Sequence, residues 1–288
     1  MITLLLLSVV ILRAEAPDTM LVEQKAFGSF QRATRLVTTP QGWIYVLDAE
    51  RNLIVLTKGE EDISSSVGGY GWSSTTFDQP TGLATDGLNL YVSDRGNHRV
   101  MRFDRSLNFI SSFVTRDTSL LAARFGSPLG VALSRLGDLF ILDGENLRVV
   151  KFGASLQYER SFGDIDDQRS RLRQPMKILL SPDDHVYVLE SDRLLEFDYF
   201  GQYLRVIGSG RFHDARGFCF IRGGIVVATP ERLFWFNDRG ELLREIPSTE
   251  IASGSPLGAM EDLAASDDRL LLLTSTQLHI IRLFTSSK

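Results

Sequence analysis

The feature that most constrains this chain is a six-residue pattern of β-branched, aromatic and other apolar residues that recurs along its 288 residues. Four copies end in an acidic residue, and they occupy residues 43–48, 89–94, 138–143 and 185–190. Two fainter copies follow at 224–229 and 269–274, so that successive copies lie 39 to 49 residues apart. A near-constant period of this size predicts a repeat protein in which each copy belongs to one supersecondary unit.

Each unit carries the signals of four short strands. An apolar segment that follows Phe-x-x-Pro precedes the pattern, and two further strands follow it, as at 99–103 and 108–113 in the second unit. Period-2 alternation between turns rich in Gly, Asp, Asn and Pro is typical of antiparallel β-structure. Four strands in each of six units predict an all-β fold, a six-bladed β-propeller with four-stranded antiparallel blades.

The two ends of the sequence predict how the ring closes. The last unit ends after its third strand, at 278–284, and only four residues remain. Near the other end, segment 22–30 resembles the fourth strand of an earlier unit and precedes the first blade. We therefore expect an N-terminal strand to complete the last blade, which leaves no unpaired edge at the seam. The expected propeller is a single domain over residues 21–284.

The first residues differ in kind from the repeats. Residues 2–12 form an apolar run, which is shorter than the about 20 residues that a membrane-spanning helix needs. The small-x-small sequence Ala14-Glu15-Ala16 follows, so residues 1–16 are predicted to be a signal peptide. The absence of Lys and Arg before the run, and Pro17 after the expected cut, argue against it. We expect a secreted or periplasmic protein without a stable transmembrane span.

Composition excludes several functional classes. The net charge of −5 argues against a nucleic-acid partner, because such surfaces need clustered Lys and Arg. The only cysteine, Cys219, lies in an apolar run and cannot form an internal disulfide or a thiolate zinc site. No Gly-x-Ser-x-Gly or phosphate-binding loop motif is present. The sequence therefore predicts no catalytic residue and no cofactor.

The second and third units resemble the NHL repeat. They share Phe-x-x-Pro-x-Gly-Leu/Val-Ala at 77–84 and 125–132, and Asn-x-Arg-Val at 97–100 and 146–149. The fourth unit keeps Pro175 and Arg193 but has Glu190 in place of the aspartate, and the other units match only as strands. The resemblance implies a six-bladed propeller. It does not imply one function, because such propellers serve as adaptors, sensors and enzymes.

Charged residues cluster where the second strand of the second unit ends, at Asp94 and Arg99. The same two positions carry Asp143 and Arg148 in the third unit, and the first unit has Asp48. A catalytic group is needed once, whereas a repeated group more often serves the ring. We expect the carboxylate to accept hydrogen bonds from turn N–H groups and the arginine to pair with it.

Charges that occur once are predicted near the axis, where the innermost strands of a propeller converge and ligands bind at the channel mouth. The position two residues after the proline is glycine in three units, at Gly82, Gly130 and Gly217, and charged in the others. Such residues either bind a zwitterionic or anionic ligand or neutralise one another around a water-filled channel. The candidates at this mouth are Arg35, Lys177, Arg216, Glu261, Asp262 and His213.

A metal-dependent enzyme is the alternative interpretation. Some NHL-type propellers are zinc-dependent lyases, and the resemblance implies about three histidine ligands near the axis for that chemistry. Only His213 of the four histidines is predicted there. A calcium-dependent, lactonase-like site would instead use the oxygens of Glu261 and Asp262. The sequence therefore predicts no metal ligands.

A glycine-rich segment, 68–72, lies between the last strand of one blade and the next Phe-x-x-Pro, on the channel-mouth face. Its Tyr70 and Trp72 are candidates for an interaction surface, since exposed aromatic residues often anchor recognition. In the alternative interpretation, Trp72 covers the adjoining blade. We expect a monomeric, non-enzymatic binding or scaffold protein that recognises a protein or glycan partner through this loop-bearing face.

Overall fold

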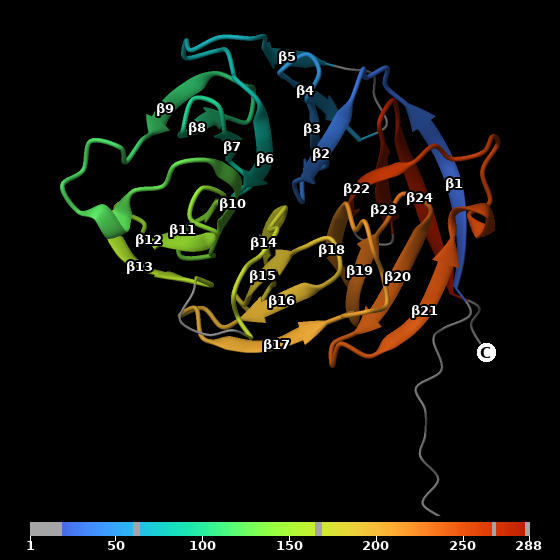
Figure 1. The fold of residues 1–288 in the computed structure, drawn as a ribbon. Coiled ribbons are helices and arrows are strands. Elements are labelled where there is room, and N and C mark those ends of the chain that lie inside the picture. Colours follow the sequence, from blue (N-terminus) through green and yellow to red (C-terminus); the bar gives the residue numbers. More distant parts are fainter. Residues whose placement is uncertain (1–18, 60–63, 165–168, 267–268, 286–288) are drawn as a thin grey trace, which may run out of the picture.

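The computed structural model describes residues 19–59, 64–164, 169–266 and 269–285. Its strands form six four-stranded antiparallel sheets arranged radially about one axis (Figure 1). The prediction of a six-bladed propeller is therefore confirmed. The expected signal peptide lies outside the described residues. Within them, no helix has the length and apolar character needed to cross a membrane.

The strands of each blade follow one another from the axis outward in chain order, except that the N-terminal strand takes the outermost place in the last blade. Blade 1 contains β2 (Ala33–Thr38), β3 (Trp43–Asp48), β4 (Leu53–Lys58) and β5 (Ser65–Gly68), and blade 2 contains β6 (Pro80–Thr85), β7 (Asn89–Asp94), β8 (Arg99–Asp104) and β9 (Phe109–Phe113). Blade 3 contains β10 (Pro128–Leu133), β11 (Leu139–Asp143), β12 (Arg148–Phe152) and β13 (Tyr158–Phe162), and blade 4 contains β14 (Lys177–Leu180), β15 (Val186–Leu189), β16 (Leu194–Phe197) and β17 (Tyr203–Ile207). Blade 5 contains β18 (Gly217–Ile221), β19 (Gly224–Ala228), β20 (Arg232–Asn237) and β21 (Leu242–Pro247), and blade 6 contains β22 (Met260–Ser266), β23 (Arg269–Thr274), β24 (Leu278–Thr285) and β1 (Thr19–Phe27). Two short 3-10 helices, Leu121–Ala123 and Ser248–Glu250, lie in loops between blades.

The ring closes through the N-terminal strand, as predicted. β1 pairs antiparallel with β24, from Thr19 opposite Thr285 to Phe27 opposite Leu278. The strand begins and ends about three residues earlier than segment 22–30, because Gly28 has a positive φ of 88° and starts the turn into blade 1. The first described strand thus completes the last blade and removes its free edge.

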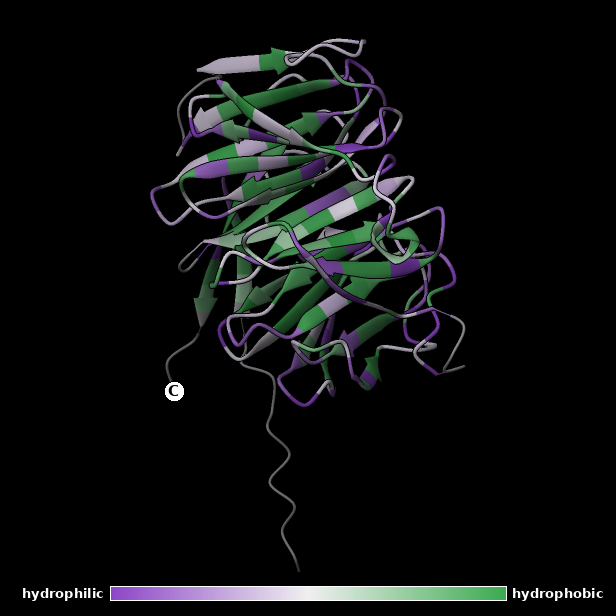
Figure 2. Cartoon of the chain, turned by 90° about the vertical axis from the view of Figure 1, so that its left-hand side faces the viewer, coloured by the Kyte–Doolittle hydropathy of each residue, from purple (hydrophilic) through white to green (hydrophobic). Residues whose placement is uncertain are grey.

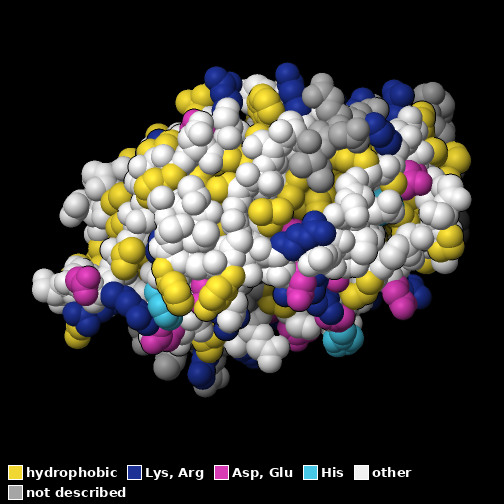
Figure 3. Space-filling view, turned by 90° about the horizontal axis from the view of Figure 1, so that it is seen from above, with side chains coloured by type: hydrophobic (Ala, Val, Ile, Leu, Met, Phe, Trp, Pro, Cys, Tyr) yellow, Lys and Arg dark blue, Asp and Glu magenta, His cyan; other side chains and the backbone are white. Residues whose placement is uncertain are grey.

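The hydrophobic core lies between neighbouring blades. One cluster joins Tyr45 and Leu56 of blade 1 to Leu83 and Phe103 of blade 2, and all four side chains are buried. Strands carry most of the hydrophobic residues in Figure 2, whereas the loops are mostly hydrophilic. Seen along its edge in Figure 3, the disc carries its charged side chains mostly near the two faces. The blades therefore pack face to face, and the faces are left for polar contacts.

The repeated charges at the strand ends form ion pairs. The Asp94 carboxylate is buried and accepts hydrogen bonds from Arg99 Nε at 2.7 Å, Asn97 Nδ2 at 2.8 Å and the backbone N–H of Asp78 at 2.8 Å. Arg99 also donates to the carbonyl oxygen of Thr76 at 3.0 Å. One pair thus ties together the end of β7, the start of β8 and the loop that enters the blade.

The next two blades repeat this arrangement. The Asp143–Arg148 pair is 3.3 Å long, and Arg148 donates to the carbonyl oxygen of Arg124. In blade 4, Glu190 pairs with Arg193 at 2.6 Å, and Arg193 donates to the carbonyl oxygen of Arg171. We call these three ion pairs, Asp94–Arg99, Asp143–Arg148 and Glu190–Arg193, the corner clamps. Their recurrence at one place in each blade indicates a structural role, as the repetition in the sequence predicted.

Candidate functional site

A β-bulge in the innermost strand turns one residue of each affected blade toward the channel mouth. The register of β2 shifts between Ala33 and Arg35, so Thr34 is the extra residue. β6, β10 and β22 shift in the same way, which gives Thr81, Leu129 and Glu261 the equivalent place. Bulges commonly redirect a side chain in this manner. In the other two blades, Met176 and Arg216 precede the first residue of the inner strand.

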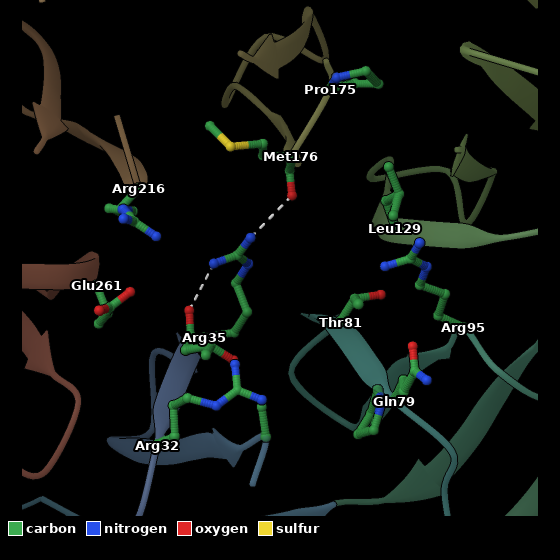
Figure 4. A pocket seen from close by; sticks show the side chains of 13 residues that line it. Arg32, Arg35, Gln79, Thr81, Arg95, Leu129, Pro175, Met176, Arg216 and Glu261 are labelled. Carbon is green, nitrogen blue, oxygen red and sulfur yellow. Dashed lines mark hydrogen bonds between the residues drawn. The ribbon is translucent and has the colours of Figure 1, made fainter. Parts of the chain in front are cut away.

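These six positions surround a cavity of about 510 Å³ at the mouth of the channel (Figure 4). Its volume lies within the range of about 300 to 1,000 Å³ that is typical of small-ligand sites. The side chains that line it come from several blades and from the turns beside them. They are Arg32, Thr34, Arg35, Ala49, Gln79, Pro80, Thr81, Arg95, Leu129, Pro175, Met176, Arg216 and Glu261.

Arg35 crosses the floor of this cavity. Its guanidinium donates to the carbonyl oxygen of Thr34 at 2.7 Å in its own blade and to that of Met176 at 3.0 Å in blade 4 (Figure 4). Below it, the axial void has a volume of only about 10 Å³. The cavity is therefore a closed socket, and a ligand has access to it only from the face.

The charged lining of the cavity is strongly cationic, with four arginines and one glutamate. Arg32 pairs with Glu50 at 3.4 Å, and Arg216 pairs with Asp214 at 3.0 Å; both pairs are solvent-accessible. Arg35 is held only by carbonyl oxygens, and Arg95 makes no side-chain hydrogen bond or ion pair with any described residue. Arg35 and Arg95 thus bring positive charge to the cavity that no described carboxylate neutralises by direct contact.

Among the described residues, Glu261 is the only carboxylate in the lining. Burial raises the pKa of its side chain, although the positive charges of Arg216 and Arg35 act in the opposite direction. Figure 4 shows Glu261 on the same side of the cavity as Arg216, facing Arg35. A half-buried carboxylate beside arginines both balances part of their charge and offers a hydrogen-bond acceptor to a ligand.

Two predicted mouth residues, Lys177 and Asp262, do not line this cavity. They lie one layer below it and form a buried ion pair of 2.5 Å. Lys177 also donates to the carbonyl oxygen of Phe218 in blade 5, and Asp262 accepts the backbone N–H of Leu36 in blade 1 at 3.1 Å. This axial ion pair therefore links four consecutive blades, and the two charges neutralise each other directly.

The predicted glycines lie in the same layer and allow the inner strands to approach closely. A Cβ on Gly82 would come within 2.7 Å of the Gly130 Cα, which no real side chain tolerates. A Cβ on Gly217 would come within 2.2 Å of the Asp262 carboxylate. The space along the axis is thus filled in two ways. Where the repeat has glycine, the inner strands approach closely, and where it has Lys177 and Asp262, the axial ion pair occupies the space.

The metal-binding alternative lacks a convergent ligand set. His213 is exposed in the loop before β18 and does not line the cavity, and Asp262 is bonded to Lys177. No group of three His, Cys, Asp or Glu side chains among the described residues has an arrangement that could hold an ion. Glu261, Asp262 and His213 are therefore not brought together.

The two aromatic candidates lie on the loop that leaves β5. Tyr70 is 66% exposed and Trp72 is 70% exposed, and their rings meet edge to face with centroids 5.7 Å apart. Asn97 donates from its side chain to the carbonyl oxygen of Gly71 between them at 2.9 Å. Asn97 lies two residues beyond Arg95, so the aromatic pair is anchored to the same turn that supplies an arginine to the mouth.

Sequence reasoning did not assign Arg32, Arg95 or Gln79 to the mouth. Arg95 follows the acidic end of β7, and the equivalent residues in blades 1, 3 and 4 are Ala49, Gly144 and Ser191. A charge present in one repeat and absent from the others was therefore a signal for Arg95. Arg32 and Gln79 reach the cavity from turns whose backbone N–H groups are bonded to the side chains of Asp48 and Asn52, and the sequence pattern does not give these contacts.

Comparison with known proteins agrees with the repeat and with the fold. The NHL repeat profile matches residues 77–103 and 125–152. A search of curated proteins finds no match.

Among solved structures, a streptogramin B lyase is similar over 92% of this chain and 98% of its own, with 11% identity and a TM-score of 0.64. Virginiamycin B lyase from Staphylococcus aureus is similar over 93% of this chain and 100% of its own, with 10% identity and a TM-score of 0.62. Hydrazine synthase from Kuenenia stuttgartiensis is similar over 84% of this chain and 74% of its own, with 13% identity and a TM-score of 0.57. At these identities the similarity concerns the fold alone.

Proposed function

We propose that this chain, an NHL-repeat six-bladed β-propeller, is an exported, non-enzymatic binding protein that recognises an anionic group of a protein or glycan partner through its loop-bearing face. The channel mouth takes the anionic group, and the surrounding loops contact the rest of the partner. Export remains the interpretation that the apolar run and Ala-Glu-Ala favour.

One observation carries this proposal. The mouth is a closed socket with four arginines against one glutamate, in a protein whose overall charge is −5. Arginines clustered at one site repel one another, which costs stability, and a bound anion relieves that repulsion. Arg35 and Arg95 keep donor groups available, and hydrogen bonds between a guanidinium and an anion are stronger than neutral ones.

A binding experiment with simple anionic probes tests the proposal. Oligoglutamate and oligogalacturonate are each titrated into the protein by isothermal calorimetry, and at least one is expected to bind. Arg95→Met is expected to weaken binding about tenfold, since loss of one charge-assisted hydrogen bond costs about 1.5 kcal/mol. Binding is also expected to weaken with added salt.

Arg105→Met is the matched control. Arg105 is also an exposed arginine in a turn of blade 2, but it lies between β8 and β9, on the opposite face. Its replacement changes the net charge equally and is expected to leave the affinity unchanged. Absence of binding by both probes, or equal loss in both variants, would contradict the proposal.

The similarity to streptogramin lyases raises the enzymatic alternative, a metal-dependent lyase or lactonase at the mouth. It would require Glu261, Asp262 and His213, or an equivalent set, to surround one site, and these three residues are separated in the fold. Metal analysis of the purified protein tests it directly. Stoichiometric zinc or calcium that is lost in Glu261→Ala would favour the enzyme over the binding protein.

A further inference from the structure

We propose that the group recognised at the mouth is a hexuronate, the carboxylate-bearing sugar of an acidic polysaccharide, and that the polysaccharide enters by its chain end. This inference rests on the proposed function and names its ligand class. It is carried by three features, which are the cations of the socket, its mixture of hydrogen-bonding groups and the aromatic pair that is anchored to the turn of Arg95.

The cations fit a carboxylate. A guanidinium is a flat fork whose parallel N–H groups match the two oxygens of a carboxylate. Arg95 points into the cavity without a described partner, and Arg35 crosses its floor (Figure 4). A ligand carboxylate between them would gain charge-assisted hydrogen bonds without breaking an existing ion pair.

The remaining polar groups fit hydroxyls. The Thr81 hydroxyl already donates to the carbonyl oxygen of Pro128 at 2.9 Å, so its oxygen is left as an acceptor. Glu261 is a second acceptor, and Gln79 offers both a donor and an acceptor. A phosphodiester or a simple dicarboxylate has no donor for Glu261 and would be repelled by it. A sugar acid brings both a carboxylate for the arginines and hydroxyls for these acceptors.

The shape of the socket fits a saccharide end rather than a passing chain. The floor is closed by Arg35, and the void beneath it has room for about one water molecule. The apolar part of the lining consists of small patches, such as Leu129, Pro175 and Met176, and includes no aromatic ring. The deep apolar pockets that anchor protein partners are missing from this lining. Flat C–H faces of a pyranose ring need only such patches.

The loop anchored to the turn of Arg95 supplies surfaces on which further sugar rings can stack. Tyr70 and Trp72 are exposed beside Gly71, whose carbonyl oxygen is bonded to Asn97 in the turn of Arg95. Aromatic rings offer a flat apolar face together with a polar tip, which suits a ligand that is apolar on one face and hydroxylated at its edges. The socket and the aromatic pair together fit a short acidic oligosaccharide.

The test uses three probes with matched lengths. Tetragalacturonate carries the sugar and the charge, its methyl ester carries the sugar alone, and tetraglutamate carries the charge alone. Each is titrated by calorimetry into the full-length protein and its variants. Tetragalacturonate is expected to bind, its ester at least tenfold more weakly, and tetraglutamate at least tenfold more weakly. Trp72→Ala and Arg95→Met are each expected to weaken binding of tetragalacturonate about three- to tenfold, whereas Arg105→Met leaves it unchanged.

The outcomes separate this inference from the proposed function. If tetraglutamate binds as tightly as tetragalacturonate and depends on Arg95, the sugar assignment is overturned while the anion-binding mouth stands. If the methyl ester binds as tightly as the acid, the carboxylate is not what is recognised and the inference is wrong. If no acidic probe binds, both proposals fall. Thermal melting of each variant confirms folding, and all three side chains replaced are exposed.

Discussion

The corner clamps and the axis use the same residue types for different purposes. In the clamps, Asp94–Arg99, Asp143–Arg148 and Glu190–Arg193 occupy one place in successive blades, and each pair is formed within a blade. At the axis, Lys177 and Asp262 each occur in one blade only, and their pair joins blades that are not neighbours. Repetition therefore marks charges that hold the ring together locally, whereas singular charges mark places where the blades differ.

The corner clamps and the axial ion pair also differ in the blades that they stabilise. Blades 5 and 6 lack a clamp, because Thr229 and Thr274 replace the acidic residue and their hydroxyls bond within their own turns. The axial ion pair contacts these same blades through Phe218 and Asp262. The axial ion pair thus ties together the two blades that have no acidic residue at the clamp position, along with blades 1 and 4. This explains why the degenerate repeats still close a regular propeller.

The largest expected effect comes from breaking the axial ion pair. Lys177→Met leaves Asp262 buried without its partner, and removal of one member of a buried pair typically costs about 3–5 kcal/mol. Urea denaturation is expected to show this loss in the free energy of unfolding. Lys177→Met combined with Asp262→Asn keeps an acceptor for the Leu36 N–H and removes the charge. The double variant should recover part of the lost stability. If Lys177→Met were as stable as the original protein, the axial ion pair would not stabilise the ring.

A clamp should matter less than the axial ion pair, because its arginine keeps access to solvent. Asp143→Ala with Arg148→Ala is expected to lower the free energy of unfolding by about 2 kcal/mol, since it removes the pair and the bond to the Arg124 carbonyl. Thr229→Val, at the equivalent place in blade 5, should cost about 1 kcal/mol or less. Equal losses at the two places, measured by thermal melting, would remove the distinction between blades with and without clamps.

The sequence predicted the fold because the repeat pattern is redundant. The six strand patterns, the Phe-x-x-Pro turns and the missing last strand each pointed to the same closed ring, and the structure shows β1 beside β24. The bounds of β1 differed most, by about three residues, where Gly28 begins a turn. Agreement among local signals is what specifies a fold.

The residues of the channel mouth were harder to predict, because equivalent positions of the repeats lie at different depths along the axis. Counting from the proline placed Arg35, Lys177 and Asp262 in one ring. The preceding residues reach the mouth instead, turned there by a bulge in four of the blades, and Lys177 and Asp262 are buried. Lys177 contacts Asp262 rather than solvent because blades 4 and 6 meet at the axis. These two residues are 85 positions apart in the sequence. Spacing within a repeat contains no information about such contacts.

A smaller effect is expected from pH at the mouth. Burial raises the pKa of Glu261. As pH falls, Glu261 therefore loses its negative charge at a higher pH than an ordinary glutamate does. The affinity of an acidic probe should therefore rise about threefold as pH falls through that raised pKa, since repulsion is removed. Calorimetry of Glu261→Gln should show the higher affinity at every pH and a weaker pH dependence. The same dependence in both proteins would mean that Glu261 does not face the ligand.

The smallest expected change in stability gives the sharpest comparison, because it lies within one turn. Arg95 and Arg99 are four residues apart, yet Arg99 belongs to a clamp and Arg95 points into the mouth without a described partner. Arg99→Met is expected to cost about 1–2 kcal/mol, because it leaves Asp94 buried with fewer hydrogen bonds. Arg95→Met should stay within about 0.5 kcal/mol of the original protein, as exposed substitutions usually do. Urea denaturation measures both. If Arg95→Met proved as destabilising as Arg99→Met, Arg95 would be part of the fold's own support, and a singular charge at the mouth would no longer indicate a ligand.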